Sequence, residues 1–430
     1  APDAGEPPAP APRFVARSVF CPPAAAGTEE ARALAVAASG PAELPLRLRP
    51  DPGRSSLPAS GVEIATVDEP ATLVTGYGGV PAAGARTSGR RFGAAAAPCT
   101  DSASPRWHFA EGSSSLTAEE SLLVHNPFPD EAIVRVLFFT PTGVRAKANL
   151  ADLAIPPGGS REVVVNDFIF RRKLLAATVE AERGRVVAWR LLVDRREDGR
   201  GIEVSAGAPA AATTWYFPDA PAGPGARGSI AVLNPSAEHE AAVTVTLVTE
   251  DRVDQPRSLV EVPVAPGSVR RIELPGGSRR GSAPASAIVT SANGVGVVAE
   301  RLVRYTGDEL RGVTAETGAT EPALRWLLGP VAREPRYDEL ALVNPGPRPA
   351  RVHVTLAAGR RLLSPGALDG VRVRAGLRAT IPLGRWTRGE EALAALVEAD
   401  EPVIVERRAF STRDRDVAAA IGSPLRTPRG

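Results

Sequence analysis

Apolar and polar residues alternate regularly in three stretches of the 430-residue chain. The first stretch has apolar side chains at Ala132, Val134, Val136 and Phe138. The pattern returns twice, at Ala241, Val243, Val245 and Leu247, and at Ala350, Val352, Val354 and Leu356. A period of two residues is typical of a β-strand with one buried side and one solvent-facing side. Several such runs, separated by Pro-Gly, Asn-Pro, Asp-Gly and Asn-Gly turns, predict antiparallel sheets.

The three stretches belong to an internal repeat. An Asn-Pro pair precedes each stretch, and its asparagines, at 126, 234 and 344, are 108 and 110 residues apart. Other landmarks keep the same order: a tryptophan opens each copy, and a glycine follows its last strand pattern. The tryptophans are Trp107, Trp215 and Trp326, and the glycines are Gly207, Gly318 and Gly422. Repeats of this length are large enough to be domains.

The first hundred residues resemble a diverged fourth copy, in which "FCPP" stands at the expected Trp-Phe start. We therefore expect an all-β chain of tandem Ig-like antiparallel β-sandwich domains that form an elongated rod, because the segments between copies are short. The expected divisions are a flexible Pro- and Ala-rich tether (1–13), a divergent sandwich with a disulfide (14–104) and three sandwich repeats (105–212, 213–323 and 324–430).

The Asn-Pro pair has a structural explanation. Proline cannot donate a hydrogen bond to a neighbouring strand, and it biases the residue before it away from helix. An asparagine side chain can bond to nearby backbone in a turn. We therefore interpret Asn126, Asn234 and Asn344 as points where one strand ends and the chain is redirected into the next.

Charge and the N-terminal residues indicate which partners and which cellular compartment to expect. The net charge is only +2 and the basic and acidic residues are interspersed, which gives little support to nucleic-acid binding. The Ala-rich start without Met is what remains after removal of a signal peptide or membrane anchor, and also what a cut at a linker would leave. We expect an extracytoplasmic protein, secreted or membrane-anchored in the cell envelope. Whether an N-terminal anchor precedes residue 1 stays open.

The only cysteines, Cys21 and Cys99, lie in the first hundred residues. In an exported protein such a pair is expected to form a disulfide, and closing a loop of this length stabilises the fold by about 4 kcal/mol in the chain-entropy model. A metal site is disfavoured because further soft ligands are absent.

Several segments resemble a repeat of exported bacterial proteins: "WHFAEGSS", "LLVHNP", "PPGGSREV" and "PVIVERRAF". With its "VFCPP" start and its second cysteine just before the first Trp copy, the chain is similar to an uncharacterised actinobacterial family of membrane-anchored or secreted proteins, known as a domain of unknown function. The resemblance covers nearly all of the chain from Phe14. The copies differ in detail, since the Glu-Gly after the aromatic start remains only at Glu111 and Gly112, and Trp189 replaces the Glu of the late strand.

Few residues are candidates for a catalytic, metal or anion-binding site. The four histidines, His108, His125, His239 and His353, occupy different repeat positions, and no Gly-x-Ser-x-Gly elbow is present. We expect neither catalytic residues nor a metal nor a cofactor, although carboxylates paired only in space would escape this reasoning. The loop Pro275 to Ser282 and the basic segment Phe170 to Lys173 could bind anions, but flexible or solvated turns explain them better.

Two repeated side chains are candidates for ligand or interdomain contacts. Arg190, Arg301 and Arg407 share strand parity with apolar neighbours, which favours a repeated structural ion pair over a ligand contact. Trp107, Trp215 and Trp326 could stack on sugars if exposed, but a tryptophan at the first strand more often fills the base of its own domain.

These features predict a non-catalytic structural, adhesive or scaffolding protein of the bacterial cell envelope with a protein or cell-wall polymer as partner. The alternative is a carbohydrate-binding protein that uses the Trp and Arg side chains on a wall polysaccharide. Neither prediction rests on the fold class, since sandwiches host unrelated roles.

Overall fold

The computed structural model describes residues 93–196, 200–221, 225–275, 285–307, 311–331, 335–358, 361–387, 393–411 and 416–425. Before residue 93 it describes seven strand segments: 16–22, 32–37, 44–49, 54–57, 62–67, 72–77 and 82–89. The predicted tether (1–13) lies outside these residues, as does the loop after Pro275 up to Ser282. Antiparallel β-strands dominate the described chain, and they form an inner set and an outer set of sheets.

The inner set consists of four four-stranded antiparallel blades, whose strands follow one another in space from the rim to the centre. They are β5 (Val62–Val67), β2 (Arg32–Ala37), β7 (Ala82–Gly89) and β8 (Gly93–Pro98); β14 (Ser160–Val164), β10 (Ala118–His125), β16 (Val187–Asp194) and β17 (Gly201–Ala206); β23 (Ser268–Glu273), β19 (Ala226–Asn234), β25 (Val298–Thr306) and β26 (Arg311–Thr317); and β32 (Arg378–Pro382), β28 (Pro335–Val343), β33 (Ala394–Ser411) and β34 (Asp416–Ile421).

An outer sheet accompanies each blade. Its strands are β1 (Ala16–Cys21), β6 (Thr72–Tyr77), β3 (Leu44–Arg49) and β4 (Arg54–Leu57); β12 (Gly143–Ala146), β11 (Ala132–Thr140), β15 (Ala176–Arg183), β9 (Arg106–Phe109) and β13 (Leu153–Ile155); β18 (Thr214–Phe217), β24 (Ser286–Ser291), β20 (Ala241–Val248), β21 (Val253–Asp254) and β22 (Val262–Val264); and β30 (Arg361–Leu363), β29 (Ala350–Ala358), β27 (Ala323–Leu328), β31 (Val371–Val373), β35 (Ser423–Pro424) and the first part of β33.

Helical segments are short. One α-helical turn, α1 (Gly384–Thr387), precedes β33, and single 3₁₀ turns occupy Ala148–Leu150, Val165–Asp167, Arg257–Leu259 and Gly366–Leu368. The helical turn α1 ends before β33 begins at Ala394.

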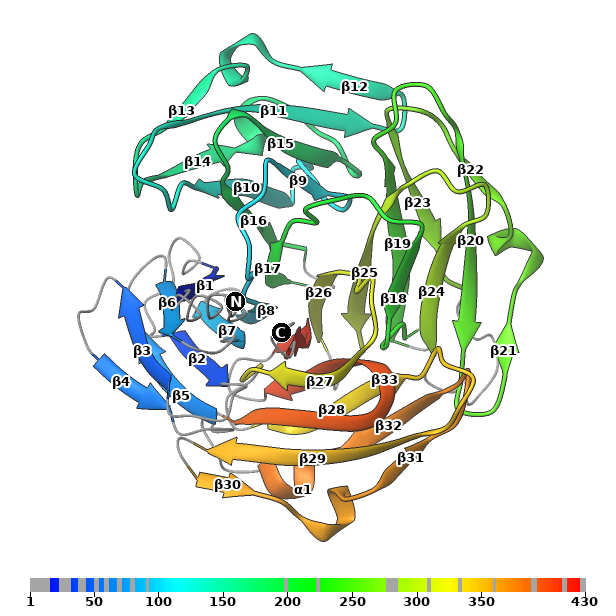
Figure 1. The fold of residues 1–430 in the computed structure, drawn as a ribbon. Coiled ribbons are helices and arrows are strands. Elements are labelled where there is room, and N and C mark those ends of the chain that lie inside the picture. The colour runs from blue at the N-terminus through cyan, green and yellow to red at the C-terminus, as the bar shows by residue number, and fades with distance from the viewer. Residues whose placement is uncertain are drawn as a thin grey trace, which may run out of the picture.

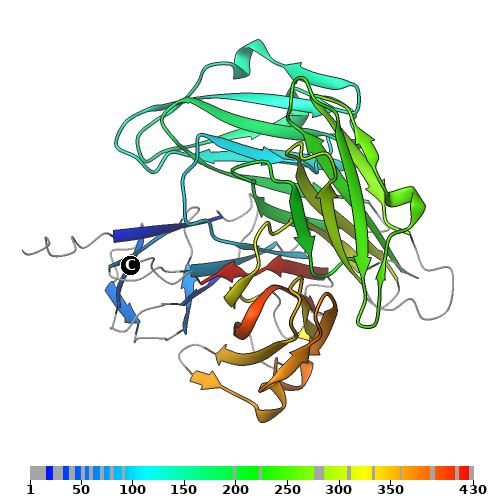
Figure 2. The same ribbon diagram turned by 45° about the vertical axis from the view of Figure 1, so that its right-hand side comes forward.

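The blades close into a ring, with β8, β17 and β26 around its centre (Figure 1). The ring is completed by β34, which lies between β26 and β8. A view turned by 45° shows the blades grouped around one centre, not placed end to end (Figure 2). The four antiparallel sheets are therefore arranged as a β-propeller, in which blades surround a central axis.

The predicted rod of Ig-like sandwiches is therefore wrong. The alternation did identify a strand with one buried side: β11 buries Ala132, Val134, Val136 and Phe138 and leaves the residues between them half-buried. The error concerns how the units meet. Alternation reports which side of a strand is buried, but it does not report that the last strand of each unit is covered by the last strand of the next unit.

Small side chains make this closure possible. On β8, Ala94 and Ala96 pack against Ala418 and Ala420 of β34. The opposite side of β8, with Ala95 and Ala97, packs against Ile202 and Val204 of β17 and Val193 of β16. Because successive strand residues point to opposite sides, one alanine-rich strand serves both neighbouring blades.

The three Asn-Pro breaks have the expected structural role. Asn126 is buried, and its side-chain amide donates to the carbonyls of Asp130 (2.7 Å) and Ile155 (3.1 Å). Its side-chain oxygen accepts from the N–H of Phe128 (3.1 Å). Asn234 and Asn344 make the corresponding bonds to the backbone of their own copies. Each asparagine thus joins two loops of its unit.

A larger residue on β8 should weaken ring closure. Ala96→Leu should lower the free energy of unfolding by about 1–3 kcal/mol, because the side chain has no free volume between β8 and β34. Urea unfolding followed by circular dichroism measures the loss. Ala146→Leu, at an exposed position of β12, is the control and should change stability little. Equal effects at the two positions would contradict tight packing at the axis.

Candidate functional site

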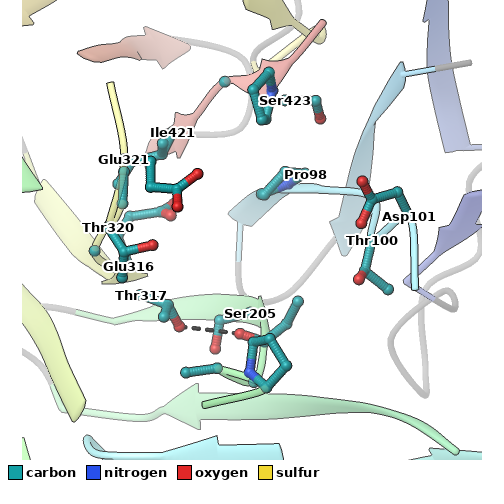
Figure 3. Close-up of a pocket in the computed structure, with 18 of the residues that line it drawn as sticks. Pro98, Thr100, Asp101, Ser205, Glu316, Thr317, Thr320, Glu321, Ile421 and Ser423 are labelled. Atoms are coloured by element: carbon teal, nitrogen blue, oxygen red, sulfur yellow. Dashed lines mark hydrogen bonds between the residues drawn. The ribbon is translucent and has the colours of Figure 1, made fainter. Parts of the chain in front are cut away.

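A cavity of about 340 Å³ opens where the axial strands end. Its wall combines segments of all four blades (Figure 3). They are Pro98 to Asp101 from the end of β8 onward, Ser205 on β17, Glu316 to Glu321 from the end of β26 onward, and Ile421 at the end of β34 with Ser423 after it. Closing the ring therefore creates a site that no single repeat contains. We call it the axial pocket.

The repeated glycines Gly207, Gly318 and Gly422 form part of its wall. A Cβ on Gly207 would lie 2.8 Å from the ring of Phe109, and one on Gly318 would lie 2.8 Å from the ring of Phe217. On Gly422 it would lie 3.1 Å from the ring of Trp326. Glycine is thus needed for the close approach of an aromatic ring to the backbone at the pocket. The sequence showed these glycines as landmarks, and they were the available signal for this site.

The axial pocket carries three carboxyl groups, from Asp101, Glu316 and Glu321. Asp101 and Glu321 are exposed at the rim, whereas Glu316 is only 3% exposed. Burial, with the nearby carboxylates of Glu406 and Glu203, raises the pKa of Glu316 well above its usual range, against the opposing charge of Arg301. The sequence does not single out any of the three, because they are not repeated and meet only at the axis.

The repeated tryptophans are buried, and Trp215 and Trp326 also line the axial pocket. Trp107, Trp215 and Trp326 are 1–2% exposed. Each indole N–H donates to a backbone carbonyl near or in the late strand of the same unit, at Val186 (2.7 Å), Val297 (2.8 Å) and Val403 (2.8 Å). Stacking on a sugar needs an open ring face. Placed as they are, these rings hold the first strand to the late strand.

The repeated arginines are also buried, and two of them connect neighbouring blades. Arg190 of β16 pairs with Glu300 of β25, and both side chains are 0% exposed. Arg301 of β25 pairs with Glu406 of β33 at 2.7 Å. Arg407 instead pairs with Asp338 of its own blade, at 2.6 and 2.9 Å. The same repeat position therefore makes an interblade contact twice and an intrablade contact once.

Backbone groups complete each interblade pair. The N–H of Glu111 donates to the Glu300 carboxylate (2.9 Å), and the N–H of Asp219 donates to the Glu406 carboxylate (3.0 Å). A buried carboxylate keeps its charge only with several such partners. Glu300 in "VAER" and Glu406 in "IVER" thus bind an arginine and a backbone N–H of the preceding unit. Trp189 replaces this glutamate in the second blade, for which the preceding blade is the one that ends in β8.

A further carboxyl lies beneath the contact between the second and third blades. Glu120 is 1% exposed and accepts a hydrogen bond from the N–H of Ser113 (2.7 Å). Burial raises the pKa of Glu120 to about 8; the charges of Glu111 and Glu300 act in the same direction, and Arg190 opposes them. This carboxyl is therefore mostly protonated at neutral pH.

The remaining candidates lie away from the axial pocket. His108 is buried, with its ring 2.8 Å from the Thr178 hydroxyl, and burial lowers its pKa to about 4. His125, His239 and His353 do not line the axial pocket. In the segment Phe170 to Lys173, Phe170 is 68% exposed and lies on the surface. Among the described residues no His, Cys, Asp and Glu group suited to a metal ion is found.

The predicted disulfide is confirmed, since Cys21 and Cys99 are bonded. It joins the end of β1 to the residue after β8, where the backbones of Phe20 and Thr100 also pair. Cys99 lies in the wall of the axial pocket. Disulfides persist in oxidising compartments, so the bond indicates an extracytoplasmic protein. No helix of the described chain has the length and apolarity to span a membrane.

Sequence comparison gives the family. Residues 78–282 and 277–405 match the profile of a family of unknown function, DUF5719. The chain belongs to this family. The matched residues include all of the second and third blades and most of the fourth. A search of curated proteins finds no match for this DUF5719 chain.

Solved structures add little for this DUF5719 protein. Thermotoga maritima 1070 is 18% identical over 25% of this chain and 94% of its own, with a TM-score of 0.22. An alpha-L-rhamnosidase of Streptomyces avermitilis, complexed with L-rhamnose, is 12% identical over 96% of this chain and 58% of its own, with a TM-score of 0.12. Titin domains I67–I69 are 9% identical over 75% of this chain and 99% of their own, with a TM-score of 0.09. Likenesses this low carry no argument about function.

Removing one partner of an interblade pair should be costly. Arg190→Met keeps the aliphatic stem but leaves the Glu300 carboxylate buried without its guanidinium, so the free energy of unfolding should fall by about 3–5 kcal/mol. Arg195→Met removes an exposed pair with Glu119 and should cost under about 1 kcal/mol. Urea unfolding compares the two variants. Similar losses would show that the buried pair has no special weight.

Glu120 should make stability depend on pH. Its pKa is about 8 in the folded protein and 4.5 for an ordinary glutamate, so its contribution to stability is full below pH 4.5 and is lost as pH rises towards 8. Glu120→Gln cannot ionise, so it should lose less stability than the natural protein between pH 5 and pH 8. Melting temperatures at both pH values test this, with the exposed Glu119→Gln as control. An unchanged pH dependence in Glu120→Gln would contradict the raised pKa.

Proposed function

We propose that this chain is a non-catalytic binding protein of the bacterial cell envelope, which holds a small ligand in the axial pocket and uses the ring as a rigid scaffold. The observation that carries the proposal is the convergence of all four blades on one cavity of about 340 Å³. Cavities of roughly 300–1,000 Å³ with a few convergent polar groups are the usual form of small-ligand sites.

The surroundings of the axial pocket support binding. Its wall is anchored by buried interblade pairs and by tryptophans bonded to backbone, so its shape is largely formed in advance. Two groups common in nucleophilic catalysis are engaged: Cys99 is in the disulfide, and the ring of His108, which does not line the axial pocket, is bonded to Thr178. The hydroxyls of Ser205 and Thr317 and the carboxyls instead offer hydrogen bonds to a ligand.

The compartment and source are part of this proposal. The disulfide fits an oxidising environment, and a cell-envelope location is the narrower interpretation that we propose. Only Lys147 and Lys173 are lysines among 51 basic residues, and 41 Gly and 42 Pro accompany them. Such usage supports a high-GC bacterium, and we propose an actinobacterial source.

Filling the axial pocket should abolish binding. Thr320 is exposed and lines the pocket, so Thr320→Trp should block it without disturbing the core. The probes are glucose, N-acetylglucosamine, glycine and n-butylammonium, observed together by saturation-transfer-difference NMR. At least one probe should give a signal with the natural protein and lose it with Thr320→Trp.

The matched control is Ala146→Trp on exposed β12, which should keep the signal. Melting temperatures establish that both variants are folded. If no probe gives a signal, or if Thr320→Trp retains every signal, the axial pocket is not the binding site and the proposed function is wrong.

A further inference from the structure

We infer that the axial pocket selects a ligand with a positively charged nitrogen, an alkylammonium or guanidinium group, and holds it against the carboxyl group of Glu316. The inference rests on the proposed function, since it names the ligand class of the same pocket. Three observations carry it: the one-sided charge of the pocket wall, a hydrogen-bonding atom of Glu316 without a partner among the described residues, and the apolar residues that line the same pocket.

The charge of the pocket wall has one sign. Asp101, Glu316 and Glu321 line it, and none of the described residues that line it is lysine, arginine or histidine. This is unusual for the chain, in which 51 basic residues nearly balance 49 acidic ones. A concave site with one sign of charge attracts ligands of the opposite sign.

Glu316 is placed to meet such a ligand. It stands near the end of β26, is 3% exposed and lines the axial pocket. Its carboxyl accepts a backbone hydrogen bond from Ile421 of β34. The second oxygen, Oε1, has no hydrogen-bond partner among the described residues. Buried polar atoms are nearly always bonded, so this oxygen marks a place for a donor from outside the chain.

The groups around Glu316 leave room for one more positive charge. Among the charged groups, Glu406 of β33 and Glu203 of β17 disfavour its ionisation and Arg301 of β25 favours it, as does the backbone hydrogen bond from Ile421. Arg301 already forms the ion pair with Glu406 and a bond to the carbonyl of Asp219. Burial and these carboxylates favour the protonated form of Glu316, and a cation that takes the place of the proton would favour the ionised form.

The rest of the pocket suits an alkyl chain. Ala208, Ala211 and Ala319 line it together with Pro209 and Pro424, so the wall also offers carbon surfaces. A cavity of about 340 Å³ is at the small end of ligand sites. The geometry thus points to a small organic cation whose stem packs on these walls while its nitrogen donates to Glu316 Oε1.

The test uses probes of one shape and different charge. Isothermal titration calorimetry compares n-butylammonium and n-butylguanidinium with neutral n-butanol and anionic butyrate. Both cations should bind at least ten times more tightly than the other two. Affinity should rise with pH, and buffers of different ionisation enthalpy should reveal proton release when a cation binds. This measurement needs no variant.

Two variants locate the effect. Glu316→Gln keeps the shape but cannot ionise, so it should weaken n-butylammonium binding at least tenfold and abolish proton release. Glu120→Gln changes another buried carboxyl with a raised pKa, outside the axial pocket, and should leave binding unchanged. If n-butanol binds as tightly as the cations, or Glu316→Gln binds normally, the inference is overturned while the proposed function stands. If Ca²⁺ displaces the cations at equal concentration, the site is a metal site and the inference is also overturned.

A last comparison identifies the source of the charged group. The peptide Gly-Gly-Lys-Gly-Gly carries the same butylammonium group on a lysine side chain. Binding as tight as that of n-butylammonium would support the inference with a protein lysine as ligand. Binding of the free amine alone would support it with a small metabolite. Loss of all probe signals with Thr320→Trp, and not with Ala146→Trp, ties either result to the axial pocket.

Discussion

The structure depends on four strands meeting around one axis. This contact is crowded, and side chains larger than valine or isoleucine would hold the strands apart. The innermost strands meet this requirement in different ways: β8 and β34 have runs of alanine, whereas β17 and β26 mix small apolar residues with Ser, Thr and Glu. Each of these four strands is hydrogen-bonded to one neighbour, and closure around the axis encloses its other edge, which protects it from unwanted pairing with another chain.

The buried Arg–Glu pairs add a second constraint to this packing. Bringing two charges out of water is expensive, so such pairs contribute little net stability compared with apolar packing. They do set geometry, because an arginine that finds no carboxylate from the next blade would remain buried and unpaired. We therefore regard the Arg190–Glu300 and Arg301–Glu406 pairs as devices that fix the angle and register between blades. The pair Arg407–Asp338 ends this series within the last blade.

The axial pocket is a consequence of the same closure. The loops after β8, β17, β26 and β34 diverge from the axis once the small residues end, and the glycines at the turning points let aromatic rings pack beneath them. A pocket formed in this way combines residues more than 300 positions apart, Asp101 and Ser423 among them. Its polar groups are free to differ between blades, because none is needed for the repeat itself.

The sequence by itself determined the strands, the repeat, the Asn-Pro turns and the disulfide, since these depend on side-chain alternation, local backbone preferences and cysteine count. It also marked the arginines as paired residues at a buried edge. Ring closure, the partners Glu300 and Glu406 and the acidic pocket were decided only by the tertiary structure. The physical reason is that alanine on β8 is compatible with many environments, and nothing local to Glu316 shows that three other blades will cover it.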